Sequence, residues 1–317
     1  MKIPISLRPT ALAWLWLAAA LTAHARTWTA TDGRTLEADF VSAAADGVVV
    51  KTSDGKTRTL PLAALSPADR EWIAAQTPGA PAPDDGKPMA LSGPFAKLVT
   101  GDWALSEREG LPFALYGSPE LAAGKKYPLI LALHGKSDNN ENGKQVGGWI
   151  KTFAQPQNFE KRPCFLVAPL CYQPYGATGG GWSDKPGDQA IELVEDLVKN
   201  LPIDETRVYV IGYSMGGFGT CHVMAEEPKL FAAGVPVAGY GWGDHADKLK
   251  RAPLWLFHAA DDATVDVAGA RQFAEMLERS KVFKYTEFPD GGHGIIGRVF
   301  DDVAVHEWLF AQGGEEK

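Results

Sequence analysis

The sequence predicts an α/β fold, with a mainly parallel sheet flanked by helices and a small all-β module in front of it. Three observations lead to this prediction. Short, almost wholly apolar runs rich in Val, Ile and Leu recur between residues 127 and 257, as is typical of buried parallel strands. Segments of helical length separate these runs, which favours strand–helix–strand connections. Before residue 77, short β-type runs alternate instead with Asp-Gly pairs, which are typical of antiparallel hairpins.

The composition is that of an ordinary globular protein. The chain has 317 residues, of which 45% are hydrophobic and 22% are charged, so it can form one large and one small domain. The formal net charge is -8, which provides no basic footprint for nucleic acid. We therefore expect no nucleic-acid partner.

Residues 1–25 are predicted to be a signal peptide. Lys2 and Arg8 precede an apolar run at 11–21 that is too short to span a bilayer comfortably. The tripeptide Ala-His-Ala that ends at Ala25 has the small residues of a cleavage site. We expect cleavage there, export to the periplasm or the medium, and no stable membrane insertion afterwards. An uncleaved anchor is the alternative.

Residues 26–76 are predicted to form a small β module. Three Asp-Gly pairs separate its short runs, which suggests four or five antiparallel strands. Ser66 and Pro67 then have the residue types of a helix N-cap and first turn. Residues 77–94 are rich in Pro, Ala and Gly, so we expect an extended linker.

The Arg-x-Trp-Thr start of this module, its Asp-Gly turns, its Val-rich strand and its final Leu-Ser-x-x-Asp resemble the SH3-like module fused to many exported bacterial hydrolases. The resemblance implies a small barrel. Its role would be either to bind an unknown ligand, such as cell-wall or polysaccharide material, or to act as a spacer.

Residues 207–217 predict a strand followed by a nucleophile elbow. A β-branched run leads into Gly-Tyr-Ser-Met-Gly, which matches Gly-x-Ser-x-Gly, and the residues after it can form a helix. A sharp turn between strand and helix exposes the serine hydroxyl, here that of Ser214. Gly212 and Gly216 are expected to be required because the backbone is crowded there.

The apolar run at 127–133 predicts a buried strand that ends at His134-Gly135-Lys136. With a nucleophile elbow, the loop after this strand and the residue after the nucleophile supply oxyanion donors. We therefore assign the backbone N–H groups of Lys136 and Met215 to an oxyanion hole. Gly135 is expected to let the loop approach the substrate pocket closely, and His134 to brace the loop.

A candidate acid follows the strand predicted at 253–257. Asp261 and Asp262 both lie just beyond the strand end, where a carboxylate can orient a catalytic histidine. The spacing His-x-x-x-Asp-x-x-Val, which begins at His258, favours Asp262. Asp261 remains the alternative.

His293 is the candidate general base. It lies between glycines after a strand predicted at 284–288, and histidine as a residue type titrates near neutrality. It also completes the expected chain order of serine, acid and histidine. Among the other histidines, His222 is expected in a helix, His245 in a loop and His306 in a C-terminal helix.

Trp182 follows the glycines at 179–181 and is predicted to wall the substrate pocket, where it would stack on a sugar or an aromatic acyl group. Packing within its own loop is the alternative.

The odd cysteine count of Cys164, Cys171 and Cys221 leaves at least one unpaired, and we expect buried thiols rather than a disulfide. No Cys/His cluster has zinc spacing, so we expect no metal and no organic cofactor. The remaining predicted elements are an edge strand at 111–117, strands at 164–169 and 232–238, and helices at 188–201, 267–280 and 301–312.

Residues 95–313 resemble exported bacterial esterases of the α/β-hydrolase superfamily. The nearest group is often labelled predicted peptidase or phospholipase/carboxylesterase, beside dienelactone hydrolases and feruloyl- or polyhydroxybutyrate-type esterases. Five stretches carry the resemblance: 127–135, 163–171, 212–219, 257–265 and 289–294. The chain departs from the pattern at Ala259, where glycine is usual, and at Asp266, where proline is usual.

The resemblance implies a serine carboxylesterase that cleaves short-chain or plant-polysaccharide esters, such as acetyl or feruloyl esters, through an acyl-enzyme. A serine peptidase of the same fold is the second hypothesis. A polysaccharide- or cell-wall-binding protein that has kept the fold is the hypothesis from another class.

Overall fold

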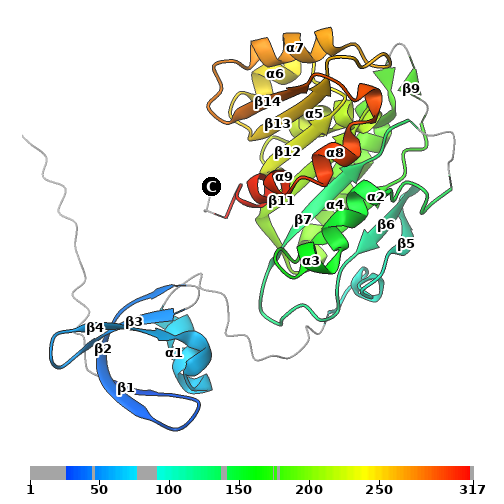
Figure 1. Ribbon diagram of the computed structural model, residues 1–317. Coiled ribbons are helices and arrows are strands. Elements are labelled where there is room, and N and C mark those ends of the chain that lie inside the picture. The colour runs from blue at the N-terminus through cyan, green and yellow to red at the C-terminus, as the bar shows by residue number, and fades with distance from the viewer. Residues whose placement is uncertain are drawn as a thin grey trace, which may run out of the picture. The chain divides into compact units, whose positions relative to one another are not determined.

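A computed structural model describes residues 26–44, 47–76, 91–136, 141–173, 175–176 and 179–314. The chain divides into two compact units, Met1–Pro83 and Asp84–Lys317 (Figure 1). The predicted signal peptide, and residues 77–90 of the predicted linker, lie outside the described residues. In the ranges that are described, no helix is long and apolar enough to cross a bilayer.

The smaller unit is a four-stranded antiparallel sheet with one α-helix. Its strands pair in the order β1-β2-β3-β4, and their bounds are Arg26–Thr29, Thr35–Ala44, Gly47–Thr52 and Thr57–Pro61. A 3₁₀ turn at Leu62–Ala64 leads to helix α1 at Pro67–Gln76. Ser66 Oγ accepts a hydrogen bond from the Asp69 N–H at 3.2 Å, which confirms the predicted N-cap. Trp28, Val48 and Val50 form the centre of the core.

The larger unit is built on an eight-stranded sheet, in the order β14-β13-β12-β11-β7-β8-β6-β5. Neighbouring strands from β14 to β8 are parallel, while β6 and β5 are antiparallel to their neighbours, so the prediction of a mainly parallel sheet is confirmed. The strand bounds are β5 Ala104–Arg108, β6 Leu111–Tyr116, β7 Tyr127–Leu133, β8 Phe165–Pro169, β11 Ile203–Tyr213, β12 Ala233–Val237, β13 Leu254–Ala259 and β14 Phe283–Phe288.

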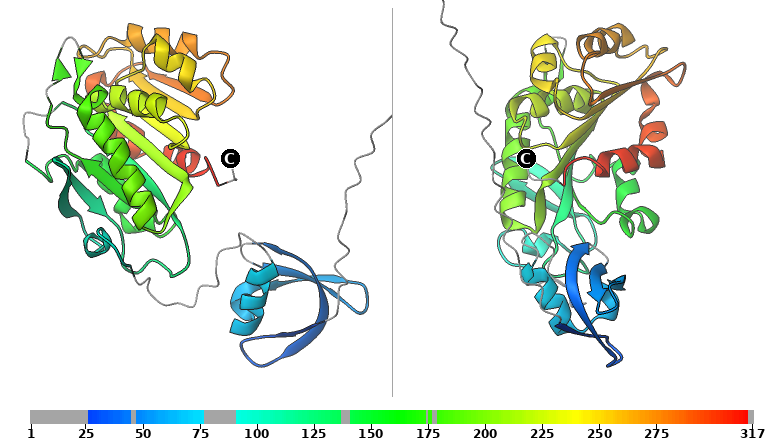
Figure 2. Two further views of the ribbon diagram at one scale, coloured as in Figure 1. Left: turned by 180° about the vertical axis from the view of Figure 1, so that it is seen from behind. Right: turned by 90° about the vertical axis from the view of Figure 1, so that its left-hand side faces the viewer.

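Helices cover both faces of this sheet (Figure 2). Residues of α4, α5, α6 and α7 contribute to one hydrophobic cluster, and residues of α2, α8 and α9 contribute to the other. The helix bounds are α2 Gly148–Ala154, α3 Pro156–Phe159, α4 Lys185–Asn200, α5 Met215–Glu226, α6 Gly243–Leu249, α7 Val267–Met276, α8 Ile296–Phe300 and α9 Val303–Phe310. Shorter elements are the 3₁₀ turns at Ala96–Leu98, Gly181–Ser183 and Gly292–Gly294, and the two-residue strands β9 Tyr175–Gly176 and β10 Gly179–Gly180.

Two sequence predictions were wrong. The segment at 111–117 is not an edge strand, because β5 lies outside it and pairs with it. Strand β5 was missed since its five residues, Ala-Leu-Ser-Glu-Arg, include three polar ones, and no face of it is fully buried. His245 lies in helix α6 rather than in a loop, and only 4% of it is exposed.

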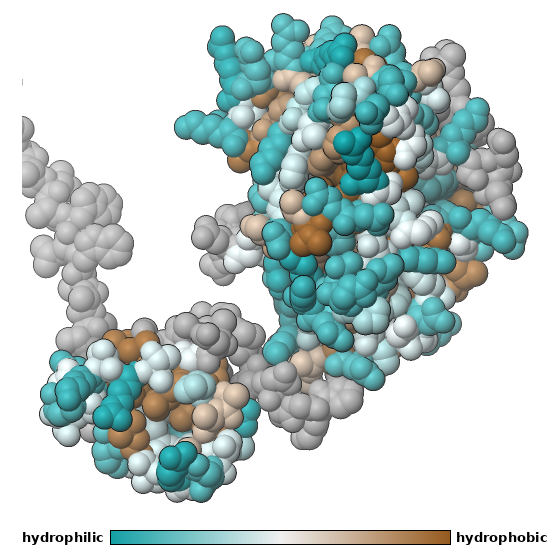
Figure 3. All heavy atoms as spheres, in the orientation of Figure 1, coloured by the Kyte–Doolittle hydropathy of each residue, from teal (hydrophilic) through white to brown (hydrophobic). Residues whose placement is uncertain are grey.

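The apolar side chains are largely enclosed. The visible face of both units is mostly hydrophilic, with scattered apolar residues between the polar ones (Figure 3). Cys164, Cys171 and Cys221 are all buried thiols without a disulfide, as expected. Burial raises the pKa of each of them, to about 11 for Cys171, which keeps the thiols protonated and unreactive near neutrality.

The strand register brings the ends of the central strands to one edge of the sheet. Gly212 of β11 lies opposite Leu133 of β7 and Pro236 of β12, and β12 and β13 are in register at Val237 and Phe257. The loops that follow β7, β11, β13 and β14 therefore meet at this edge. These four loops contain the residues that the sequence analysis selected as catalytic or as oxyanion donors.

Candidate active site

Ser214 lies at the turn between β11 and α5 in a conformation that few side chains adopt. Its φ is 55° and its ψ is -116°. Such a conformation costs on the order of 1–3 kcal/mol and is kept only where the surroundings impose it. Here the Ser214 N–H donates to Val237 O at 2.8 Å, and Ser214 O accepts from the N–H groups of Gly217 and Phe218.

Glycine is required on both sides of this turn, as predicted. A Cβ atom on Gly216 would lie 1.8 Å from Leu133 O, and one on Gly212 would lie 2.0 Å from Gly216 O. Both contacting atoms are backbone carbonyl oxygens, which cannot move aside as the end of a flexible side chain could. The crowding arises because the first turn of α5 packs directly on the ends of β7 and β11.

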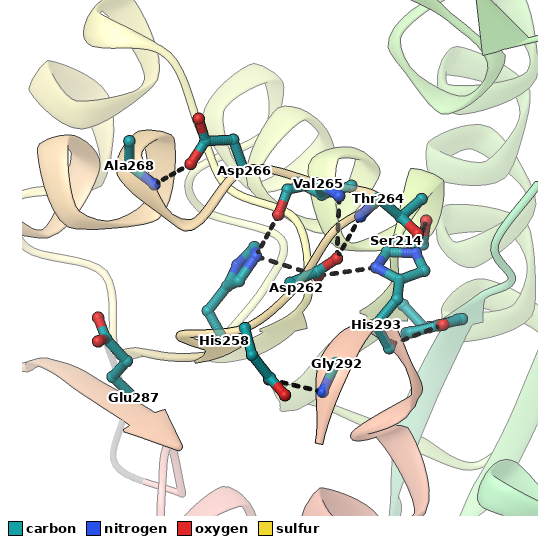
Figure 4. Close-up of polar contacts among 12 residues, drawn as sticks. Ser214, His258, Asp262, Thr264, Val265, Asp266, Ala268, Glu287, Gly292 and His293 are labelled. Carbon is teal, nitrogen blue, oxygen red and sulfur yellow. Dashed lines mark hydrogen bonds and ion pairs between the residues drawn. The ribbon is translucent and has the colours of Figure 1, made fainter. Parts of the chain in front are cut away.

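The structure brings Ser214, His293 and Asp262 into one hydrogen-bonded chain (Figure 4). His293 Nε2 lies 2.8 Å from Ser214 Oγ, and His293 Nδ1 lies 2.8 Å from Asp262 Oδ2. Because a carboxylate can only accept, Nδ1 carries the proton and Nε2 is free to accept the serine proton. This is the arrangement that activates a serine as a nucleophile.

Asp262 is held on both of its carboxylate oxygens. Its Oδ1 accepts from the N–H groups of Thr264 at 2.9 Å and Val265 at 3.0 Å, and its Oδ2 faces His293. Burial by itself would raise the pKa of Asp262, but the hydrogen bonds from His293, Val265 and Thr264 outweigh it, so the pKa is lowered. The carboxyl group is therefore ionised at neutral pH and can stabilise a charged imidazole.

Asp261, the alternative acid, contacts the same loop without touching the His293 ring. Its Oδ1 accepts from the Gly292 N–H at 2.7 Å, and its Oδ2 from the Gly291 N–H at 3.3 Å. The two adjacent acids thus contact different parts of the loop that carries His293. Asp261 binds the backbone just before His293, and Asp262 binds the imidazole.

Tyr213 is a site residue that the sequence analysis missed. Its hydroxyl donates to His293 O at 2.8 Å, and its ring lies 5.1 Å from the His293 ring. Burial, and to a lesser extent the charge of Asp262, raises the pKa of Tyr213, so the phenol remains a donor. The only signal was its place in the variable second position of Gly-x-Ser-x-Gly, which carries no chemical requirement.

The two predicted oxyanion donors belong to segments that adjoin the serine. Met215 is the first residue of α5, where backbone N–H groups have no partner within the helix. Lys136 follows Gly135, and a Cβ atom on Gly135 would lie 3.4 Å from Ser214 Cβ. The loop after β7 therefore passes close beside the serine, as predicted for Gly135.

His134 and Trp182 stabilise the loop after β7 by hydrogen bonds. His134 Nε2 accepts from the Cys171 N–H at 2.9 Å, so Nδ1 carries the proton and faces Gly135 O at 2.6 Å. Burial lowers the pKa of His134, which keeps the ring neutral. The Trp182 indole N–H donates to His134 O at 2.9 Å, and Trp182 has 0% exposed surface. This burial favours loop packing over contact between Trp182 and a substrate.

Trp242 is the aromatic side chain beside the elbow that remains accessible. It is 41% exposed and stacks on Phe218, with ring centroids 5.6 Å apart and planes at 24°. Phe218 lies one helical turn after the serine. A Cβ atom on Gly239 would lie 2.5 Å from Ser214 O, so the chain that leads to Trp242 passes against the elbow. Trp242 could not be selected from the sequence, because no motif includes it.

The departure at Asp266 has a structural explanation. Its side chain accepts from the Ala268 N–H at 2.9 Å and caps the start of α7. A proline at this position could not supply such a cap. The acid loop is undisturbed, since no hydrogen bond links Asp266 to Asp262 among the described residues.

Part of the chain is similar to known peptidases and esterases. Residues 175–241, which include the elbow, match the prolyl oligopeptidase family. The chain is 27% identical over 181 residues to a bifunctional acetylxylan esterase/xylanase of Neocallimastix patriciarum. That alignment covers 56% of this chain and 25% of the relative, so the chain spans a quarter of the relative's length.

Solved structures of esterases superpose on the larger unit of this chain. A thermostable esterase superposes with a TM-score of 0.60 at 28% identity, over 67% of this chain and 62% of the other. The feruloyl esterase module of Clostridium thermocellum superposes with a TM-score of 0.53 over 74% of this chain and 98% of the module. At 13% identity the second likeness shows the fold alone. With the sheet order and the elbow, these likenesses show an α/β-hydrolase fold for the larger unit.

Proposed function

We propose that the protein is a serine carboxylic ester hydrolase that works through Ser214, His293 and Asp262. The observation that carries this proposal is the continuous chain of two 2.8 Å hydrogen bonds from Ser214 Oγ to Asp262 Oδ2. It occurs at a strained elbow, where the serine hydroxyl is presented at the edge of the sheet. The similarity to an acetylxylan esterase/xylanase and to a thermostable esterase supports the same reaction class.

The reaction proceeds in two halves. In the first, Ser214 Oγ attacks the ester carbonyl carbon while His293 Nε2 takes the serine proton. The imidazolium then gives this proton to the departing alkoxide, which leaves as an alcohol. The acyl group stays on Ser214 as the acyl-enzyme. In the second half, His293 removes a proton from water, the resulting hydroxide attacks the acyl carbonyl, and Ser214 leaves with the proton restored.

Two groups stabilise the charges that develop. Asp262 holds His293 in the tautomer with a proton on Nδ1 and stabilises the imidazolium. The N–H groups of Lys136 and Met215 bind the negative oxygen of the tetrahedral intermediate. Donors of this kind contribute roughly 3 kcal/mol each, because they are oriented before the reaction begins. All of these groups come from the protein chain, so the reaction requires no cofactor.

Short-chain or plant-polysaccharide esters, such as acetyl and feruloyl esters, are the proposed substrates. The similarity to a bifunctional acetylxylan esterase/xylanase supports this class. Gly135, which brings the loop after β7 close to the serine, is proposed to line the substrate pocket. Trp242 presents an accessible aromatic face to a sugar or phenyl ring, and we place it in the substrate pocket in preference to the buried Trp182.

A serine peptidase is the second candidate, and the match of residues 175–241 to the prolyl oligopeptidase family favours it. The same triad and oxyanion donors can cleave an amide, so amide and ester turnover must be compared directly. A role restricted to binding polysaccharide fits less well, because binding does not require an aligned Ser-His-Asp chain.

We also propose the domain bounds, the export and the role of the smaller unit. We place the catalytic domain at 95–313 and a signal peptide at 1–25, with export to the periplasm or the medium. The smaller unit is proposed to be an SH3-like barrel with an unknown ligand. Its four antiparallel strands support this proposal.

The test is hydrolysis of p-nitrophenyl acetate, butyrate and octanoate, methyl ferulate, acetylated xylan and a peptide p-nitroanilide by the mature protein. We expect ester turnover that Ser214→Ala reduces by at least about 10³-fold. Fluorophosphonate labelling should add one equivalent of mass to the wild type and none to Ser214→Ala. Ester turnover that survives in Ser214→Ala would refute the mechanism. Serine-dependent turnover of the anilide alone would replace the esterase by the peptidase.

A further inference from the structure

His258 is a buried titratable residue that the proposed reaction does not use. It lies near the end of β13, four residues before Asp262, and none of its surface is exposed. Its Nε2 lies 3.0 Å from Val265 O and 3.2 Å from Asp262 Oδ2 (Figure 4). A second histidine therefore contacts the carboxylate oxygen that also faces His293 Nδ1.

The surroundings of His258 select one form of its ring. Both neighbours of Nε2, a carbonyl and a carboxylate, can only accept, so Nε2 must carry the proton. Nδ1 is buried and has no hydrogen-bond partner among the described residues. A second proton on Nδ1 would create a buried N–H group without an acceptor, which is more costly than an unused lone pair. The geometry therefore specifies a neutral ring that donates from Nε2.

Other polar groups near His258 are engaged elsewhere. Glu287 lies opposite it on β14, but its carboxylate binds Arg271 and Tyr285. The Tyr240 ring lies 6.2 Å away and tilted, which is a packing contact. The polar contacts of the His258 side chain thus run to the acid loop, through Asp262 and Val265.

We propose that His258 is a positioning residue: its Nε2–H donates to Val265 O and lies 3.2 Å from Asp262 Oδ2, so it holds the turn that directs Oδ2 toward His293 Nδ1–H. This inference rests on the proposed triad. The Thr264 and Val265 N–H groups fix Oδ1, and His258 holds the Val265 end of this turn by its hydrogen bond to Val265 O while its Nε2 contacts Oδ2. Without His258, the Val265 carbonyl loses this donor, and the turn that holds the Asp262 carboxylate is free to shift.

The proposal gives a physical reason for the His-x-x-x-Asp-x-x-Val spacing. Val265 donates its N–H to Asp262 Oδ1 and accepts from His258 at its carbonyl. The histidine therefore meets the turn from 262 to 265 at both ends, by a contact with the acid and by a hydrogen bond to the backbone. A shorter or longer spacing would remove one of the two contacts.

The test compares three variants in the full-length mature protein. His258→Leu keeps the approximate volume and removes the donor, whereas His258→Gln retains an N–H at a similar reach. The matched control is His306→Leu. His306 is 2% exposed and bonds a backbone carbonyl, Phe300 O, at 2.8 Å, but it has no contact with the triad. Each variant is assayed for kcat and KM with p-nitrophenyl acetate and for thermal unfolding.

We expect His258→Leu to lower kcat at least about tenfold, because small displacements of a catalytic group have large effects on rate. Its KM should change less than about twofold, since the substrate does not touch His258. His258→Gln should recover most of kcat. His306→Leu should lose stability but retain the wild-type kcat. A kcat loss in His258→Leu no larger than that in His306→Leu would overturn the proposal.

A spectroscopic readout separates this inference from the proposed function. The proton between His293 Nδ1 and Asp262 should give a downfield ¹H NMR signal that is absent in His293→Ala. It should shift in His258→Leu and keep its position in His306→Leu. An unchanged signal in His258→Leu would reject the positioning role even if no ester is turned over. Should His258→Leu fail to fold, His258→Asn replaces it, because the shorter amide cannot reach Val265 O or Oδ2.

Discussion

The hydroxyl of Tyr213 donates to the backbone carbonyl of His293, so the residue before the nucleophile holds the loop that carries the base. The two residues are 80 positions apart in the chain. Their contact fixes the distance between the end of β11 and the loop after β14. It acts on the backbone, whereas Asp262 acts on the ring.

Tyr213→Phe should therefore lower kcat by about fivefold to tenfold, in line with the roughly 1 kcal/mol that a hydrogen bond contributes. KM should stay near the wild-type value, because the ring packing is retained. The matched control is Tyr209→Phe on the same strand. It also removes a hydroxyl that donates to a backbone carbonyl, Gln312 O at 2.8 Å, but away from the site. A kcat loss of equal size in both variants would contradict the role of Tyr213.

The neighbouring acids should differ sharply in mutants. Asp262→Asn should lower kcat by about 10³–10⁴-fold, because an amide that donates to His293 favours the wrong tautomer. Asp261→Asn should cost about tenfold or less, since its remaining oxygen can still accept the Gly292 N–H. Steady-state kinetics with p-nitrophenyl acetate measures both. The reverse ranking would transfer the triad role to Asp261.

Trp242→Ala should discriminate between substrates. We expect KM for methyl ferulate to rise about threefold to tenfold, because a stacked aromatic contact contributes roughly 0.5–1.5 kcal/mol. KM for p-nitrophenyl acetate should change less, as long as only its small acyl group is held in the pocket. Trp308→Ala, on α9 on the opposite face of the sheet, is the control. A uniform change for both esters would show that Trp242 does not select the substrate.

Glu287 should make stability depend on pH at acid pH. Hydrogen bonds from Arg271, and then from Tyr285, lower the pKa of Glu287 to about 2. In the unfolded chain the pKa is about 4.3, so the folded state binds the proton more weakly. The stabilisation is complete above about pH 4.3 and is lost as the pH falls toward 2.

Urea unfolding of the wild type and of Glu287→Gln at pH 7, 4 and 3 measures this effect. The difference in unfolding free energy should be largest at pH 7 and smallest at pH 3. Glu278→Gln serves as the control, because Glu278 is exposed and its contact with Arg279 is 3.9 Å long. A difference that grows on acidification would contradict the prediction.

Gly216→Ala should destabilise the fold. The new methyl group would overlap Leu133 O, and the backbone on neither side can move without disturbing the sheet. We expect a loss of about 3 kcal/mol or more, which is toward the upper end for an overpacked core. Gly148→Ala, where a Cβ atom meets nothing within 4 Å, should leave the melting temperature nearly unchanged. Equal melting temperatures for the two variants would show that the elbow can relax.

Much of the fold and the triad could be predicted because the signals are local. The apolar runs marked the buried parallel strands, and Ser214 and Asp262 each follow one of them. His293 follows the mixed strand β14 and was selected by its flanking glycines and its place in the chain order. The crowding at Gly216 also followed from the turn alone. Strand β5 was missed because an edge strand with mixed residues has no distinctive pattern.

The contacts that support the triad could not be predicted, because they join distant segments. Nothing in the residue types of Tyr213 or Asp261 indicates a bond to the loop after β14. The burial of Trp182 was also not predictable, because its loop packs against α5 only in the folded chain: a Cβ atom on Gly219 would lie 2.4 Å from Trp182 Cβ. For the same reason, the spacing that begins at His258 identified the acid without revealing what the histidine does.

The triad is assembled from three separate strand ends, and the order of the strands has a practical consequence. Ser214 follows β11, Asp262 follows β13 and His293 follows β14, with β12 between the first two. The three triad residues and the strands β11 to β14 all lie within residues 203–293. The rate at which Ser214 regains its reactivity toward a covalent label therefore reports how fast this half of the sheet assembles. In a refolding experiment, the capacity for labelling should appear only when the last strand has docked, after most of the helical circular dichroism signal has returned.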